Sequence, residues 1–200
     1  MAARSVLQFK VTLLDVEPVV WRRIQISDLC SFWDLHVEIQ DAMGWTDSHL
    51  HEFEMNHSIE KGKQYLGIPD DGYDDFHPTL PGWDYRVRDY LIINDQFIYR
   101  YDFGDDWNHR IEYEGLHEKQ PDAKYPMCIA GERACPPEDV GGVPGYERFL
   151  EAITTPRHPE RKELLEWVGG KFDSEKFDPT TVKFDSPSKR WKIAFERLSV

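Results

Sequence analysis

Two runs of alternating aromatic residues, joined by an acidic turn, restrict the fold of this chain more than any other feature of its sequence. Aromatic and polar side chains alternate on both sides of a turn at residues 104–106. If those three residues form the loop, Phe103 lies opposite Trp107 and Tyr101 opposite His109, and opposed residues of an antiparallel pair share one face. A two-residue loop would mix the aromatic face with the charged face, which a half-buried sheet resists. We therefore expect a central hairpin whose aromatic face lies in the core.

Three other segments alternate like strands. Residues 7–13 and 19–26 flank a short turn, which predicts an N-terminal hairpin. Residues 48–55 predict a third strand, on which His49 and His51 share one face because alternate side chains of a strand project together. Together with the central hairpin, these strands predict an antiparallel or mixed sheet.

Helical spacing occurs once near the N-terminus and several times near the C-terminus. A capping-box pattern at Ser31, apolar residues at helical intervals and Gly44 as the stop predict a helix over residues 31–43. His36 and Gln40 lie at the boundary of its apolar stripe, where we expect them to make ordinary hydrogen bonds. Further helices are expected over residues 146–153 and 159–168, in a short turn opened by Asp178 and Pro179, and over residues 189–198.

Two segments between these elements are rich in Gly and Pro. Residues 56–83 include the acidic run 70–75 and are expected to form an insertion or a functional flap, with a mobile solvated loop as the favoured interpretation. Residues 125–146 also carry apolar anchors, so we expect them to follow one ordered path. Within this second segment, two prolines precede Glu138 and Asp139 and present both carboxylates rigidly.

These patterns predict a single α+β domain over residues 1–200. An antiparallel or mixed sheet is built from β-hairpins and is packed by an N-terminal helix and several C-terminal helices. The sheet, the first helix and the 56–83 segment occupy residues 5–116. The Pro/Gly-rich loop and the helical part occupy residues 117–200.

The chain is acidic, with 37 Asp and Glu against 24 Lys and Arg and a formal net charge of −13. Nonspecific binding of duplex DNA needs a basic footprint, so we do not expect it. The charge suits a solvated surface, a cation site or a basic protein partner. The basic stretch at residues 189–197 leaves open a contact with a phosphate-bearing partner, although such a helix is usually a solvated face.

The cysteines and the apolar runs bear on location. Three cysteines without metal-type spacing indicate a reducing compartment. No apolar run approaches the ~18 residues of a membrane-spanning helix, and the N-terminus alternates like a strand rather than a signal peptide. We therefore expect a cytoplasmic protein that does not contact a membrane.

Charged residues from three segments are candidates for a binding cleft. Arg22 and Arg23 point to opposite faces of their strand, so at least one lies at or near the covered side, either in a salt bridge to a helix or as an anion-binding group. The acidic turn and the Pro-Pro-Glu-Asp loop supply carboxylates, and we expect these two loops to lie within ~10 Å of each other. The cleft candidates are Arg22, Arg23, Asp102, Asp105, Asp106, Trp107, His109, Glu138 and Asp139.

A metal site would draw on some of the same carboxylates together with histidine. A His-x-His pair on a strand can hold a metal, although such pairs also occur without one. Hard oxygen ligands suit Mg²⁺, Mn²⁺ or Ca²⁺, so a divalent cation is the one cofactor candidate. The expected register places His109 and Asp102 on opposite faces, so only the loop carboxylates should converge. The candidate metal ligands are His49, His51, Asp105, Asp106 and Glu138.

Several motifs together carry a resemblance to a known family. They are Val20 to Arg23, Leu35 to Gln40, Gly44 to Phe53, Tyr101 to Trp107 with His109, and Cys135 to Gly142. In this order and spacing the chain resembles the Ri-plasmid open-reading-frame-three-like family over roughly residues 5–185. The resemblance implies an α+β domain found on plasmids and bacterial chromosomes, hence an association with mobile elements, and implies no established activity.

A transposon-resolvase label on some members of that family does not suit this chain. A serine resolvase needs a nucleophilic serine with neighbouring arginines, followed by a basic helix-turn-helix. Ser5 and Ser27 have no such setting, and the chain is acidic.

Two hypotheses from different classes follow. The first is a binding or adaptor module without catalysis, whose carboxylates fix turns through Asx hydrogen bonds and meet a basic partner. The alternative is a metal-dependent hydrolase, a phosphoesterase or nuclease, whose clustered carboxylates hold a cation that activates water. The sequence shows no phosphate-binding loop, no dinucleotide fingerprint and no nucleophile elbow.

Overall fold

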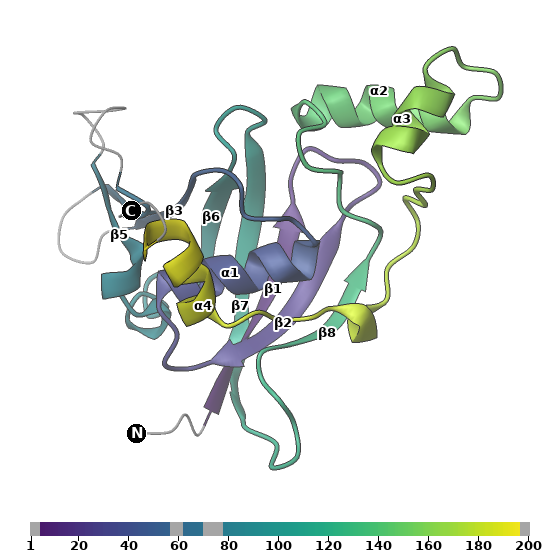
Figure 1. The fold of residues 1–200 in the computed structure, drawn as a ribbon. Coiled ribbons are helices and arrows are strands. Elements are labelled where there is room, and N and C mark those ends of the chain that lie inside the picture. The colour runs from purple at the N-terminus through teal and green to yellow at the C-terminus, as the bar shows by residue number, and fades with distance from the viewer. Residues whose placement is uncertain (1–4, 57–61, 70–77, 197–200) are drawn as a thin grey trace.

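A computed structural model describes residues 5–56, 62–69 and 78–196 and arranges their strands in one eight-stranded sheet (Figure 1). The strand order is β5-β4-β3-β6-β7-β1-β2-β8. Every neighbouring pair is antiparallel except β4 and β5, so the sheet is mixed and the expected α+β class is confirmed. The strands are β1 (Ser5–Leu13), β2 (Trp21–Ser27), β3 (His51–Asn56), β4 (Lys63–Gly67), β5 (Thr79–Pro81), β6 (Gln96–Tyr101), β7 (Trp107–Glu118) and β8 (Met127–Glu132).

The helices lie in three places relative to the sheet. In Figure 1, α1 crosses the sheet, α2 and α3 lie together at one corner, and α4 lies beside α1 near β3 and β5. The helices are α1 (Phe32–Met43), α2 (Gly142–Thr154), α3 (Arg161–Trp167) and α4 (Pro187–Trp191), with the shorter turns η1 (Gly82–Asp84), η2 (Val87–Asp89), η3 (Pro179–Thr181) and η4 (Lys192–Glu196). No helix in the described part of the chain is long and apolar enough to span a membrane.

The central hairpin of β6 and β7 keeps the predicted faces but has a different register. Tyr101 pairs with Trp107 and Tyr99 with His109, so the loop holds five residues rather than three. The cause is Asp102, whose φ of 56° takes it out of the strand while its Oδ1 accepts from the backbone N–H of Gly104 at 3.0 Å. A shift of two residues preserves the alternation of faces. The expected pairing of Phe103 with Trp107 is wrong, and Phe103 is 43% exposed.

The aromatic face of this hairpin forms the centre of the core, as predicted. Tyr99, Tyr101 and Trp107 are buried in one apolar cluster that also includes residues of β1, β2, β3 and α1. The polar residues that alternate with the aromatic ones lie on the opposite, solvent-facing side of the strands. On that side Arg23 of β2 pairs with Glu114 of β7 across the intervening strand β1. The layout is therefore a sheet covered mainly on one face.

Helix α1 begins and ends where its sequence predicts. The Ser31 side chain accepts from the backbone of Asp34, the Asp34 side chain accepts from the backbone of Ser31, and Gly44 ends the helix with a φ of 90°. His36 and Gln40 were expected at the boundary of the apolar stripe, but both are fully buried. They are tolerated inside because each bonds the Tyr99 hydroxyl, at 2.8 and 2.9 Å.

Two segments expected to be irregular contribute strands to the sheet. The 56–83 segment holds β4 and β5, which extend the sheet beyond β3, so it is not a simple loop. Its acidic run at residues 70–75 lies outside the described residues. The 125–146 segment is ordered as expected but contains β8, which pairs with β2. Of the three added strands, β5 and β8 form the two edges of the sheet and β4 lies between β3 and β5. Their short, Gly- or Pro-flanked sequences give little periodic signal.

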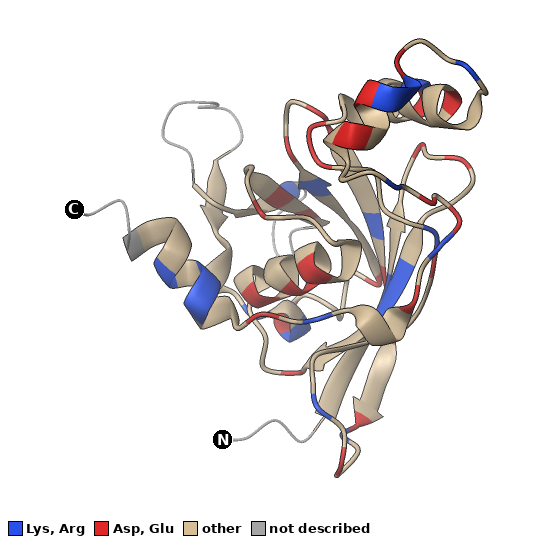
Figure 2. Ribbon diagram, turned by 45° about the vertical axis from the view of Figure 1, so that its right-hand side comes forward, with Lys and Arg blue, Asp and Glu red and all other residues tan. Residues whose placement is uncertain are grey.

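The C-terminal elements were predicted in type and approximate position. The side chain of Asp178 accepts from the backbone of Thr180 and caps η3 as expected. The basic stretch forms α4 and η4, and Figure 2 shows its blue residues beside the red residues of α1. Arg190 is the contact, because it pairs with Asp41, Asp47 and Asp185. At least this cation of the stretch is therefore held by the protein itself.

Candidate cation site

Three loops meet at one end of the central hairpin. They are the segment between α1 and β3, the turn at residues 102–106, and the loop leading into α2. The backbone N–H of Gly141 donates to Oδ2 of Asp105 at 3.0 Å, so the two acidic loops meet as predicted. A Cβ on Gly142 would come within 2.5 Å of the Asp105 carbonyl oxygen, and Gly142 has a φ of 66°. The close approach of the loops therefore requires glycine at this position.

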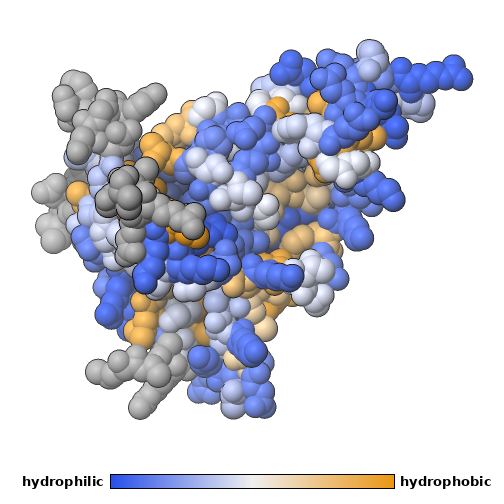
Figure 3. Space-filling view, viewed as in Figure 1, coloured by the Kyte–Doolittle hydropathy of each residue, from blue (hydrophilic) through white to orange (hydrophobic). Residues whose placement is uncertain are grey.

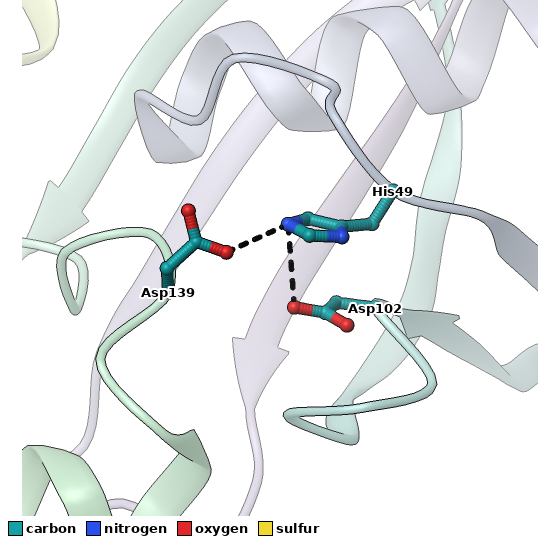
Figure 4. Close-up of side chains that lie close together, drawn as sticks. All are labelled: His49, Asp102 and Asp139. Carbon is teal, nitrogen blue, oxygen red and sulfur yellow. Dashed lines mark hydrogen bonds and ion pairs between the residues drawn. The ribbon is translucent and has the colours of Figure 1, made fainter.

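His49, Asp102 and Asp139 converge where the loops meet (Figure 4). Nε2 of His49 lies 2.9 Å from Oδ1 of Asp139 and 3.5 Å from Oδ2 of Asp102. One potential ligand atom from each residue lies within 4.8 Å of the other two. Exposure of the side chains increases across the cluster, from 10% for Asp102 through 31% for His49 to 69% for Asp139. The cluster is thus anchored inside and open to solvent on one side.

Left-handed backbone positions both aspartates of the cluster. Asp102 has a φ of 56° and Asp139 a φ of 59°, and Asp47 and Asp106 nearby have φ values of 59° and 54°. Aspartate tolerates this region better than most residues because its short side chain can bond local backbone groups. Asp102 does so with one oxygen and turns the other toward His49. The turn geometry and the cluster geometry therefore depend on the same side chain.

Glu138 lies beside this cluster but is held by other partners. Its Oε2 accepts from the backbone N–H of Thr46 at 2.8 Å and from the Thr46 hydroxyl, and its Oε1 accepts from the Tyr101 hydroxyl. Burial acts to raise the pKa of Glu138, but these hydrogen bonds outweigh it and lower the pKa below its usual value. Burial and the bond to Glu138 raise the pKa of Tyr101. The pair is therefore a carboxylate accepting from a neutral phenol.

The predicted His-x-His pair does not form. Strand β3 begins at His51, so His49 lies in the preceding loop and His51 points into the core. His51 stacks on His36 with ring centroids 3.5 Å apart, and burial lowers its pKa well below the usual value. His109 is also buried, and burial lowers its pKa to about 3. Among the described residues, the cluster that could hold a metal includes neither of these histidines.

The two arginines predicted for the cleft lie elsewhere. Arg22 is 1% exposed and donates to the carbonyl oxygens of Ala42, Trp21 and Glu132, while its guanidinium covers the ring of Phe177. Arg23 lies on the outer face and pairs with Glu114 through two hydrogen bonds of 2.7 and 2.8 Å. The predicted opposite orientation is right, but the salt bridge joins two strands rather than a strand and a helix.

The remaining candidates divide between scaffold and surface. Trp107 is buried in the core. Asp105 fixes the adjoining loop, and Asp106 pairs with Arg100 at 3.3 Å across the outer face. Asp102 and Asp139 have the chemistry of metal ligands but are not among the ligands predicted from sequence, because the expected register turns Asp102 away from the loop carboxylates. Their combination with His49 depends on contacts between residues far apart in sequence, for which local patterns give no signal.

A pocket of about 420 Å³ adjoins the site on the side of Glu138. It lies between the end of α1 and the corner formed by α2 and α3. Figure 3 shows hydrophobic surface between this corner and the body of the molecule. The lining residues are Met43, Gly44, Trp45, Cys135, Pro136, Pro137, Glu138, Trp167, Val168 and Phe172.

A mixed sheet covered by a capped helix, with a His–Asp–Asp cluster where three loops meet, defines the chain as an α+β protein with a candidate cation site. The chain belongs to the family described as plasmid pRiA4b ORF-3-like protein, whose model matches residues 5–181. The predicted family is thereby confirmed.

Two relatives show how far this similarity extends. Protein y4hQ of Sinorhizobium fredii, described as uncharacterised, is 38% identical over 189 residues, which cover 92% of this chain and 90% of the relative. The crystal structure of MM3350 from Methanosarcina mazei Go1, a protein of unknown function, is 37% identical and matches with a TM-score of 0.83. That match covers 92% of this chain and all (100%) of the solved chain. Neither description assigns an activity.

Proposed function

We propose that this protein is a binding module that holds a divalent cation at His49, Asp102 and Asp139. One observation carries the proposal, namely that a ligand atom from each of the three side chains lies within 4.8 Å of the others. Two carboxylates and an imidazole around one point form a set that metal sites use widely. Without a cation, the two aspartates place like charges on either side of one ring.

The chemistry of the three ligands favours a borderline cation. Imidazole suits Zn²⁺ and the two carboxylates suit Mn²⁺, whereas Ca²⁺ and Mg²⁺ favour sites built from oxygen ligands alone. Three protein ligands leave coordination positions open, and Asp139 lies on the surface, so a group from a partner could complete the shell. The net charge of −13 supports a basic protein as that partner and argues against nonspecific duplex DNA. We further propose that the protein is cytoplasmic and is associated with mobile elements.

Metal-dependent hydrolysis of a phosphoester or nucleic acid is the second candidate. The same open coordination positions favour it, because a catalytic metal needs a site for water or substrate. A nearby carboxylate would have to act as the general base. Glu138 is the neighbouring candidate, but both of its oxygens already accept hydrogen bonds from Thr46 and Tyr101. The geometry therefore favours binding over catalysis.

Metal titration of wild-type protein and two matched variants tests the proposal. Asp102→Asn keeps an oxygen for the turn but removes the charge that faces His49. Asp106→Asn makes the same change in the same left-handed turn, away from the cluster. We expect Zn²⁺ or Mn²⁺ at 100 times its dissociation constant to stabilise the wild type and Asp106→Asn by about 2.7 kcal/mol, which corresponds to roughly 5–10 °C in Tm.

Asp102→Asn should lose most of this stabilisation, and calorimetry should show the same ranking of affinities. The proposal is wrong if no cation stabilises the wild type, or if Asp102→Asn responds as strongly as Asp106→Asn. Hydrolysis is tested on the metal-loaded wild type with a nitrophenyl phosphodiester. Turnover that Asp102→Asn abolishes would move the protein from the binding class to the enzyme class.

A further inference from the structure

The pocket beside the cation site has aromatic walls from three parts of the chain. Trp45 follows α1, Trp167 ends α3, and Phe172 follows α3. Its volume of about 420 Å³ lies within the range of small-ligand sites. Trp45 is fixed because its indole N–H donates to the carbonyl oxygen of Pro136 at 3.0 Å. Trp167 is held by an edge contact with Phe149, with ring centroids 6.1 Å apart.

One carboxylate supplies the formal charge of this lining. Among the described residues that line the pocket, Glu138 is the only acidic or basic one, and none is Lys, Arg or His. The oxygens of Glu138 accept hydrogen bonds from the backbone and hydroxyl of Thr46 and from the Tyr101 hydroxyl, and these donors stabilise the carboxylate form. Oε2 already accepts two of these bonds, but Oε1 accepts only the one from Tyr101 and keeps a second lone pair for another donor. The pocket therefore offers a fixed negative charge in an otherwise uncharged, aromatic setting.

The outer wall of the pocket is an exposed tryptophan. Trp167 is 48% exposed, although indole is among the side chains that gain most from being covered. The same residue borders a second hollow of about 310 Å³, which Asp139, Glu160 and the cation Arg148 also line. The second hollow therefore carries charges of both signs, whereas Glu138 is the charged residue in the described lining of the first.

We propose that this pocket binds an alkylammonium group. The ammonium would lie against Glu138, where its charge is matched, and its alkyl chain would lie among Trp45, Trp167 and Phe172. Aromatic rings favour such a ligand because their faces attract cations and their edges pack against methylene groups. The group is carried either by a free amine or by a lysine side chain of a protein. The pocket shares no lining residue with the His49–Asp102–Asp139 cluster, so the two sites can be tested separately.

Titration with matched cationic and neutral probes tests the chemistry of the ligand. We expect pentylammonium to quench tryptophan emission saturably, and pentanol to bind at least about tenfold more weakly because it lacks the charge that Glu138 matches. A capped pentapeptide with one central lysine distinguishes the two sources. Binding of the peptide with affinity equal to or tighter than pentylammonium indicates a protein partner, whereas binding of pentylammonium alone indicates a free amine. Acetylation of the lysine should abolish peptide binding.

Two variants and a control test the location. Glu138→Gln and Trp167→Leu should each weaken pentylammonium binding about tenfold, whereas Glu160→Gln, which removes a charge from the second hollow, should leave it unchanged. Trp167→Leu provides a second test if Glu138→Gln disturbs the loop. Equal binding of pentanol, or unchanged affinity in Trp167→Leu, overturns the proposal.

A cation response separates this proposal from the proposed function. Trp167→Leu should keep the thermal response to Zn²⁺ or Mn²⁺, and Asp102→Asn should keep the affinity for pentylammonium. A result that contradicts one of the two proposed sites therefore does not contradict the other.

Discussion

At the scale of single residues, this chain buries several ionisable groups and handles each in a different way. His36 is bonded through both ring nitrogens, to the Tyr99 hydroxyl and to Asp47. His51 and His109 are kept neutral by burial, which lowers the pKa of each. Glu38 is 4% exposed, and its Oε2 has no hydrogen-bond partner. A buried carboxyl of this kind favours the protonated form in the folded state.

The burial of Glu38 determines how its contribution to the free energy of unfolding changes with pH. Desolvation, together with the nearby Asp34 and Asp41 carboxylates, raises the pKa of Glu38 well above its usual value. The folded state therefore binds a proton that the unfolded state has lost above pH ~4.3. The contribution of Glu38 to stability is full below that pH and is lost as pH rises toward the folded-state pKa.

Substituting Glu38→Gln should therefore remove this loss. The difference in the free energy of unfolding between Glu38→Gln and wild type should grow with pH by up to about 1.4 kcal/mol per unit within the window that starts near pH 4.3. Urea unfolding at half-unit intervals from pH 4.5 to 8 measures it. Glu151→Gln, an exposed change on α2, should show a flat difference. A flat difference for Glu38→Gln as well would mean that Glu38 is ionised in the folded protein throughout this range.

At the scale of elements, Arg22 joins parts of the fold that are distant in sequence. Its Nε donates to Ala42 in the last turn of α1, at 2.9 Å, and Nη1 donates to the carbonyl oxygen of Glu132 at the end of β8, also at 2.9 Å. The ring of Phe177, which precedes η3, lies 3.6 Å from the guanidinium carbon. A cation at the end of α1 also complements the negative end of the helix dipole. The planar guanidinium can make these contacts at once, and a lysine ammonium cannot.

Substituting Arg22→Lys should therefore destabilise the protein by about 2–3 kcal/mol, because a buried carbonyl loses a charged donor. Arg23→Lys is the matched control, since it makes the same change one residue away, on the outer face. The side chain of Arg23 is 30% exposed in its pair with Glu114, so Arg23→Lys should cost no more than about 1 kcal/mol. Urea unfolding of both variants measures the difference. Equal costs would show that Arg22 acts only by filling space.

The elements also show which features local sequence can predict. The alternation around Tyr99 and Trp107 specifies which side chains are buried. Side chains of a strand alternate with a period of two, so a register shift of two residues leaves each of them on the same face. The alternation does not specify loop length, which depends on the left-handed φ of Asp102. The capping box at Ser31 acts within one turn and was predicted correctly. The pairing of β8 with β2 is a contact across a hundred residues, and nothing within Met127–Glu132 itself encodes it.

The candidate site follows the same division. The two acidic loops were expected to meet because both carry carboxylates that suit one cleft, and the contact of Gly141 with Asp105 confirms this. The choice of His49 over His51 could not be predicted, because it depends on where β3 begins. The partnership of His49 with Asp139 joins positions 90 residues apart in the sequence. Such partners are defined only once the sheet has brought their loops together.

At the scale of the whole molecule, the corner formed by α2 and α3 is joined to the sheet through aromatic packing. Phe149 of α2 is 2% exposed and contacts Trp167 and Phe172 within the corner. Tyr146 and Phe149 also belong to the apolar cluster that includes the sheet residues. A continuous core of this kind predicts that the described residues unfold as one cooperative unit, in line with the single domain expected from the sequence.

Unfolding of a core variant in the corner tests this organisation. Phe149→Ala should destabilise the protein by about 3–5 kcal/mol because it leaves a cavity where a buried ring was packed. Tryptophan emission includes the signals of Trp107 in the sheet and of Trp45, which packs against it. The emission transition should shift to lower urea concentration together with the helical circular dichroism. Glu147→Ala, an exposed change on the same helix, should move both transitions by less than about 0.5 kcal/mol. If Phe149→Ala shifts the helical signal alone and leaves the emission transition in place, the corner unfolds by itself. The aromatic pocket would then open and close with it, and its affinity for ligand would depend on the stability of that corner.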